Sequence, residues 1–207
     1  MTTLLVAHSW GTYVGLRVVA EHPERYIAYV GTGQMSDADP VATRDVQRTL
    51  VEAGARAREL PDVDTRMTHG EVPTEDDLFA TGGELRTASS FLPLIWIGLQ
   101  APEYSLADVM NVQKGAQLWM HRIRDEQPWQ WFAAHTSFGV PIYFFVGRYD
   151  SNTPSSLASD YLERIQAPDK GIVWFEQSAH FPFLEEPDRF ASAVLDVTAR
   201  AQTALSP

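Results

Sequence analysis

Cysteine is absent from the sequence, which excludes disulfide bonds, thiolate metal ligands and a cysteine nucleophile, and fits a reducing compartment. Basic residues are scarce: 16 Lys and Arg stand against 27 Asp and Glu, giving a formal net charge of -11 at pH 7. Because phosphate backbones and anionic lipids are bound by basic surfaces, we expect neither a nucleic-acid partner nor a membrane-surface role.

Long hydrophobic runs are also missing. The longest extends from Phe91 to Leu99 and contains Pro93, well short of the roughly 20 residues that span a bilayer. The N-terminus lacks the charged segment and cleavage site of a signal peptide, so we expect a cytoplasmic protein. No two histidines have metal-ligand spacing and no glycine-rich phosphate loop is present, so we predict no metal and no cofactor.

Apolar runs alternate with helical patterns at both ends of the chain, which predicts an α/β fold. The runs that predict strands are Leu4–Ala7, Tyr26–Gly31, Val140–Gly147 and Gly171–Glu176. The patterns that predict helices cover Thr12–Ala20, Pro154–Ile165 with Thr153 as N-cap, and the segment after Pro187. Crossovers of this kind produce a parallel, doubly wound sheet, here of about four strands.

The middle of the chain, from about residue 36 to 137, lacks strand-like runs and shows interrupted helical patterns, including one with Ser105 as N-cap. We therefore predict a core of residues 1–35 and 138–207, with an inserted helical cap at 36–137. Four tryptophans fall in the cap, where packing is favoured over a role in a substrate pocket: Trp96, Trp119, Trp129 and Trp131.

The stretch LLVAHSWGTYVGL, residues 4–16, places a serine between the first predicted strand and helix. Ala7 and Gly11 bracket Ser9 in A-H-S-W-G, a variant of the G-x-S-x-G nucleophile elbow. A serine projected from such a sharp turn needs small neighbours, so the pattern predicts a nucleophile at Ser9. The alternative is an ordinary helix N-cap serine.

A nucleophilic serine needs a base, and the base needs an orienting carboxylate. Asp150 and His180 each follow a predicted strand, in GRYDSNTP and QSAHFPF, so the order along the chain is serine, acid, histidine. Either could instead be structural, Asp150 as a turn residue and His180 as a loop histidine. Asp160 lies within a predicted helix and Glu176 is too close to His180 to fill the acid position. The other histidines fit the order less well: His8, His22, His69, His121 and His135.

Together these motifs resemble the α/β-hydrolase superfamily, and HSWGTYVGLRVVAEHPERY, YFFVGRYDSNTP and SAHFPFLEEPDRF resemble its proline iminopeptidase-like branch. The resemblance implies that Ser9 is the nucleophile, Asp150 the acid and His180 the base, with the backbone N–H of Trp10 as an oxyanion donor. It implies acyl transfer to water from an amide or ester in a small-molecule or short peptide substrate. In this branch cap carboxylates bind the substrate amine, and Glu84 and Glu103 are conceivable candidates.

The chain departs from the family pattern before the elbow. Members carry four strands there and a loop with an HGGPG-like motif that supplies a second oxyanion donor, whereas eight residues precede Ser9. Loss of one such donor typically costs about 3 kcal/mol of transition-state stabilisation. We therefore expect the C-terminal part of a hydrolase, with Leu4–Ala7 as an apolar edge strand open to pairing with a second copy. Two functions follow as alternatives: a serine hydrolase of iminopeptidase or esterase type, and a non-catalytic hydrolase fragment that acts as a binding or oligomerising module.

Overall fold

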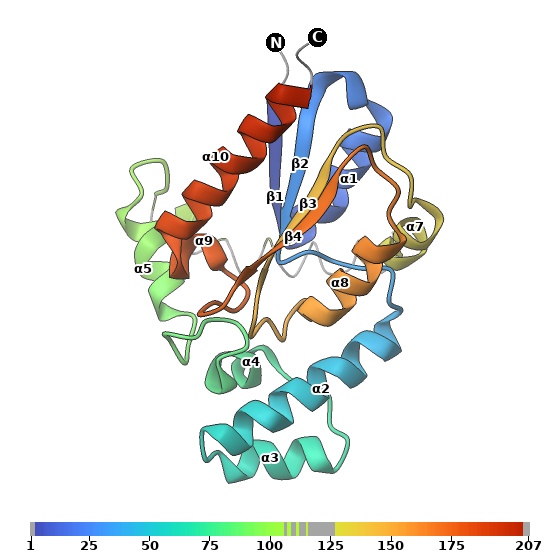
Figure 1. Cartoon of the computed structure of the whole chain (residues 1–207). Coiled ribbons are helices and arrows are strands. Elements are labelled where there is room, and N and C mark those ends of the chain that lie inside the picture. Colours follow the sequence, from blue (N-terminus) through green and yellow to red (C-terminus); the bar gives the residue numbers. More distant parts are fainter. Residues whose placement is uncertain (1–2, 106, 109–110, 112–114, 116–126, 205–207) are drawn as a thin grey trace.

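Four parallel strands form the centre of the computed structural model, which describes residues 3–105, 107–108, 111, 115 and 127–204 (Figure 1). Their order in the sheet follows the chain: β1 (Thr3–His8), β2 (Tyr26–Thr32), β3 (Ile142–Gly147) and β4 (Lys170–Phe175). All three pairings are parallel. The predicted α/β class and parallel sheet are confirmed.

Helices cover both faces of the sheet. One face packs against α1 (Trp10–Glu21), α7 (Pro128–Ala134) and α8 (Ser155–Arg164), and the other against α10 (Pro187–Ala204). Successive side chains of a strand point to opposite faces. Phe144 accordingly joins the core beneath α1 and α8, whereas Phe145 joins the core beneath α10. This alternation explains why β3 is apolar along its whole length.

Among the helices whose bounds fall in the described ranges are also η1 (Pro23–Arg25), α2 (Pro40–Ala57), α3 (Pro61–Thr68), α4 (Glu75–Thr81), α5 (Leu92–Gln100) and α9 (Pro182–Glu185). Of these, α2, α3 and α4 form a separate group beyond one end of the sheet (Figure 1), with a small core of Val51, Met67 and Leu78. Thr74 and Asp77 make a reciprocal capping box at the start of α4. These helices are part of the predicted helical cap.

Some predicted helix features differ in the structure. Helix α8 begins at Ser155 with Pro154 at its N-cap position, so Thr153 lies one residue too early to cap the helix. The Thr153 hydroxyl instead donates to the Asp150 carboxylate at 2.8 Å. A charged carboxylate is a stronger hydrogen-bond acceptor than a neutral group, which favours this contact. Ser105 does make reciprocal capping hydrogen bonds with Asp108.

The cap tryptophans have different environments. Trp96 is 64 % exposed, so the predicted packing role is wrong for this residue. Trp131 packs against the core beneath α1, as predicted. Trp119 and most of the predicted helix that follows Ser105 lie outside the described residues. Within the described ranges, no helix has both the length and the apolar character needed to cross a membrane.

Gly147, the last residue of β3, lies against the backbone of the loop that follows β4. A Cβ built at Gly147 would lie 1.9 Å from the Ala179 carbonyl oxygen, whereas one built at Gly11 in α1 would meet nothing within 4 Å. We predict that Gly147→Ala lowers the free energy of unfolding by about 2 kcal/mol or more, because backbone must move. Gly11→Ala should leave it unchanged or raise it by up to about 1 kcal/mol. Urea denaturation of both variants tests this, and equal losses would contradict it.

Candidate active site

Ser9 occupies a strained turn between β1 and α1. Its φ of 51° and ψ of -125° lie in a region that costs a non-glycine residue roughly 1–3 kcal/mol. The Ser9 N–H donates to the Thr32 carbonyl at 3.0 Å, and the Ser9 carbonyl accepts from the N–H and the hydroxyl of Thr12 at 2.8 and 2.6 Å. Ser9 stands at the N-cap position of α1, but its hydroxyl makes no capping hydrogen bond. The turn therefore presents this hydroxyl without using it to stabilise the helix.

The small residues that the turn requires are not all those expected from the sequence. A side chain at Gly11 would have open space among the described residues. Gly15 is needed instead, since its Cβ would lie 2.9 Å from Tyr29, and so is Gly33 after β2, with φ 53°. A Cβ at Gly33 would lie 2.6 Å from the Cε1 atom of His180. Absence of a side chain at Gly33 therefore makes room for the imidazole.

Asp150 is buried in the loop after β3, with 3 % of its surface exposed. One carboxylate oxygen accepts from the N–H groups of Asn152 and Thr153 at 2.9 and 2.8 Å. The other accepts from the Thr153 hydroxyl at 2.8 Å and from His180 Nδ1 at 2.9 Å. Both oxygens are thus satisfied, and the carboxylate is fixed in one orientation.

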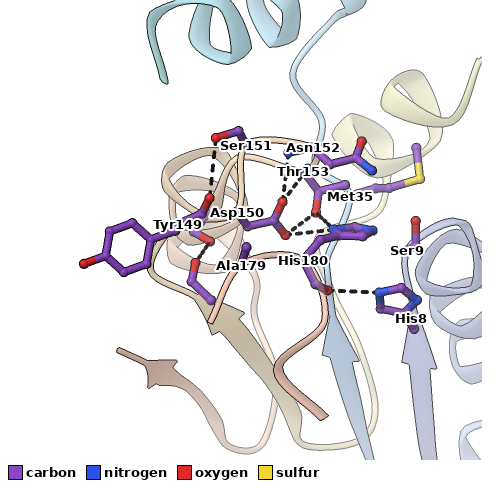
Figure 2. A network of polar contacts seen from close by, with 12 residues as sticks. His8, Ser9, Met35, Tyr149, Asp150, Ser151, Asn152, Thr153, Ala179 and His180 are labelled. Carbon is purple, nitrogen blue, oxygen red and sulfur yellow. Dashed lines mark hydrogen bonds and ion pairs between the residues drawn. The ribbon is translucent and has the colours of Figure 1, made fainter. Parts of the chain in front are cut away.

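His180 is 1 % exposed and follows β4. In Figure 2 its imidazole lies between the Asp150 carboxylate on one side and Ser9 on the other. Burial acts to lower the pKa of His180, but the charge and hydrogen bond of Asp150, with the charge of Glu84, raise it above its usual value. The structure brings Asp150 and His180 into direct contact, and Ser9 lies at the same edge of the sheet.

His8, which precedes Ser9, contacts the His180 loop directly. Its Nε2 lies 3.0 Å from the His180 carbonyl oxygen (Figure 2), and since a carbonyl only accepts, Nε2 carries the proton. The ring also packs against Phe181 and Phe183. Burial, followed by the charge of His180, lowers the pKa of His8 from 6.5 to about 4, so the ring is neutral at pH 7. The sequence contains no signal for this contact.

Glu84, between α4 and α5, is a buried carboxyl group beside this network. Its backbone carbonyl accepts from the His180 N–H at 3.0 Å, while the Oε2 atom has no hydrogen-bond partner among the described residues. Burial raises the pKa of Glu84 from 4.5 to about 7; His180 and Asn152 oppose the shift, and Asp150 and Glu75 add to it. Glu84 is therefore largely protonated at mildly acidic pH.

The other residues considered from the sequence lie elsewhere. Glu103 is exposed, as is Asp160 on α8. Glu176 pairs with Arg148 at 2.6 Å in an exposed contact. His135 stacks on Trp131 with 4.2 Å between ring centroids. His22 and His69 also lie away from the network: His22 faces Glu24, and His69 contacts the Thr65 carbonyl. His121 lies outside the described residues.

Trp10 opens α1, so its backbone N–H lies at the positive end of the helix dipole, directly after Ser9. A cavity of about 530 Å³ adjoins both residues. Its walls come from the loop after β2, the start of α2, the start of α7 and the loop after Asp150. In the described part of the chain, no group of three or more His, Asp or Glu side chains is arranged to hold a metal ion.

Comparison with known proteins identifies the class to which this fold belongs. The chain belongs to the alpha/beta hydrolase family, which it matches over residues 2–193. The resemblance to the proline iminopeptidase-like branch is also confirmed. The probable aminopeptidase YbaC from Bacillus subtilis (strain 168) is 24 % identical over 201 residues, covering 92 % of this chain and 63 % of YbaC.

Two solved structures share the fold. A proline iminopeptidase-related protein from Thermus thermophilus superimposes with a TM-score of 0.58 at 18 % identity, over 99 % of this chain and 66 % of that one. The proline iminopeptidase of Mycobacterium smegmatis gives 0.56 at 14 % identity, over 99 % and 67 %. The chain thus spans about two thirds of the length of these relatives.

The raised pKa of Glu84 predicts a pH-dependent effect on stability. An acid with a folded-state pKa of about 7 and an ordinary value of 4.5 binds its proton more tightly in the folded state. Stability is therefore lost as pH rises from about 4.5 to 7, by roughly 3 kcal/mol. Glu84→Gln cannot ionise, so its free energy of unfolding relative to wild type should increase between pH 5 and pH 8.

Urea denaturation at both pH values measures the difference. Glu103→Gln, at an exposed carboxylate, is the matched control and should show no such trend. A Glu84→Gln variant whose stability follows the wild-type pH profile would contradict the prediction.

Proposed function

We propose that the protein is a serine hydrolase in which Ser9, His180 and Asp150 form a catalytic triad. The observation that carries the proposal is the buried hydrogen bond of 2.9 Å between His180 Nδ1 and Asp150, at the sheet edge where the strained turn presents Ser9. A histidine oriented by a buried carboxylate next to a serine is the arrangement that acyl transfer needs.

In this mechanism the Ser9 Oγ attacks the carbonyl carbon of an amide or ester, and His180 Nε2 takes the hydroxyl proton. Asp150 stabilises the resulting imidazolium through Nδ1–H. The imidazolium then gives the proton to the leaving amine or alcohol as the carbon–nitrogen or carbon–oxygen bond breaks. Water, deprotonated by His180, releases the acyl group and restores Ser9.

The backbone N–H of Trp10 is the proposed donor to the oxyanion, from the first turn of α1. One donor lost or gained in such a site changes the rate by roughly 10² to 10³. Substrates are small molecules or short peptides, processed in a fold that is shared with iminopeptidases. We assign residues 1–35 and 138–207 to the core and 36–137 to the cap.

A fluorophosphonate probe should label the folded chain at Ser9, and Ser9→Ala should abolish labelling. Asp150→Asn should slow labelling by a factor on the order of 10³–10⁴, because the amide no longer holds the imidazole in the productive tautomer. Mass spectrometry of the labelled peptide identifies the site, and circular dichroism checks folding. Absence of labelling in folded wild-type protein would overturn the proposal.

A non-catalytic role as a binding or oligomerising module is the second candidate. It is favoured by β1, which pairs with β2 alone among the described strands and leaves Val6 43 % exposed. Such an apolar edge pairs readily with another chain. Sedimentation separates the two candidates, since a monomer with esterase turnover contradicts this one.

A further inference from the structure

We propose that the cavity beside Ser9 binds substrates carrying a carboxylate or similar anionic group, and that Arg44 recognises it. The proposal rests on the proposed function, because it assigns the substrate class of the same site. It concerns the part of the substrate remote from the bond that is cleaved, and makes Arg44 a specificity-determining residue.

The cavity wall is mainly apolar. Its apolar lining residues are Trp10, Met35, Ala38, Pro40, Pro128, Trp129, Pro154 and Leu157. A pocket of this kind binds the hydrocarbon part of a ligand and fixes its orientation through a few polar groups. The available polar groups therefore determine which ligand fits.

Three polar side chains of the wall already have partners within the protein. The Gln34 amide accepts from the Tyr29 hydroxyl and donates to the Met35 carbonyl. Gln47 donates to the Asn152 carbonyl at 2.6 Å, and the Thr43 hydroxyl donates to the Ala38 carbonyl. These groups hold the wall together.

Arg44 differs from these neighbours. Among the described residues no carboxylate lies within ion-pair distance of its guanidinium, and no Asp or Glu lines the cavity. Arg48, one turn further along α2, is paired with Asp45 at 3.0 Å. Asp39 lies between two lining residues in the sequence, but its carboxylate accepts hydrogen bonds from the first N–H groups of α2. Arg44 is the charged group that this part of the wall presents to a ligand.

A guanidinium recognises a carboxylate through two parallel hydrogen bonds, with shape as well as charge complementarity. A substrate with a free amine would instead meet a like charge at this wall. Arg44 places a positive charge at the cavity in a chain whose formal net charge is -11. The cavity therefore favours an acyl group that ends in a carboxylate over one that ends in an ammonium group.

Kinetics with three matched para-nitrophenyl esters test the preference: the glutarate monoester, the pentanoate ester and the trimethylammonium-butyrate ester. The kcat/KM of the wild type should be highest for the glutarate monoester, intermediate for the pentanoate ester and lowest for the trimethylammonium-butyrate ester. Arg44→Gln should reduce the ratio of glutarate to pentanoate about fivefold, the scale of one partly exposed ion pair. Arg48→Gln is the matched control on the same helix and should keep the wild-type ratio. Equal ratios in wild type and Arg44→Gln would overturn the proposal.

Binding to the Ser9→Ala variant provides a readout that does not require turnover. Equilibrium dialysis should show tighter binding of the glutarate monoester than of the pentanoate ester, and Ser9→Ala/Arg44→Gln should lose the difference. If wild type cleaves no ester while Ser9→Ala still discriminates, the serine hydrolase proposal fails and the anion site stands. If wild type cleaves all three esters without preference, the anion site fails and the hydrolase proposal stands.

Discussion

The hydrogen bond between His180 and Asp150 is the contact on which the candidate site depends. It joins two loops that follow different strands, and both partners are almost completely buried. Burial of a charged group is costly unless its polar atoms have partners. Three donors from Asn152 and Thr153 therefore accompany the imidazole at the carboxylate. This arrangement leaves the far side of the ring facing Ser9.

The backbone around this contact is also held in place by hydrogen bonds and by close packing. The N–H of His180 is held by the Glu84 carbonyl and its carbonyl by His8. Gly33 and Gly147 provide the space that the imidazole and its loop occupy. The main chain at His180 is consequently held from the elbow side, from the cap side and from the end of β3, while the hydrogen bond to Asp150 orients the ring.

Much of the fold could be predicted because the signals are local. Four apolar runs of strand length, separated by helical periodicity, define a parallel sheet, and parallel strands bring their carboxyl ends to one edge. Ser9, Asp150 and His180 each follow such a strand, so their grouping at one edge follows from topology. Ala7 and Gly11 mark the turn at Ser9 in the sequence.

The rest depends on contacts between distant segments, which no local pattern encodes. Thr12 holds the Ser9 carbonyl, yet in sequence it is an ordinary helix residue. The sequence suggests Glu84 only as a cap acid for binding an amine, whereas its burial beside His180 arises from how the cap meets the core. The motif gives Gly11 a steric role that Gly33 and Gly15 fill instead. Most of these contacts join residues that are distant in sequence, so they are apparent only in the folded chain.

The segment between α4 and α5 has a mechanical consequence. Gly83 accepts a main-chain hydrogen bond from Ser151, in the aspartate loop, and Glu84 accepts one from His180. Two adjacent peptide units thus anchor the helical insertion to both polar loops at once. A movement of the insertion away from the core at this point would break both hydrogen bonds and release the loops that carry Asp150 and His180. Neither Gly83 nor Glu84 lines the cavity beside Ser9, which α2 and α7 border, so a ligand that occupies the cavity leaves both hydrogen bonds intact.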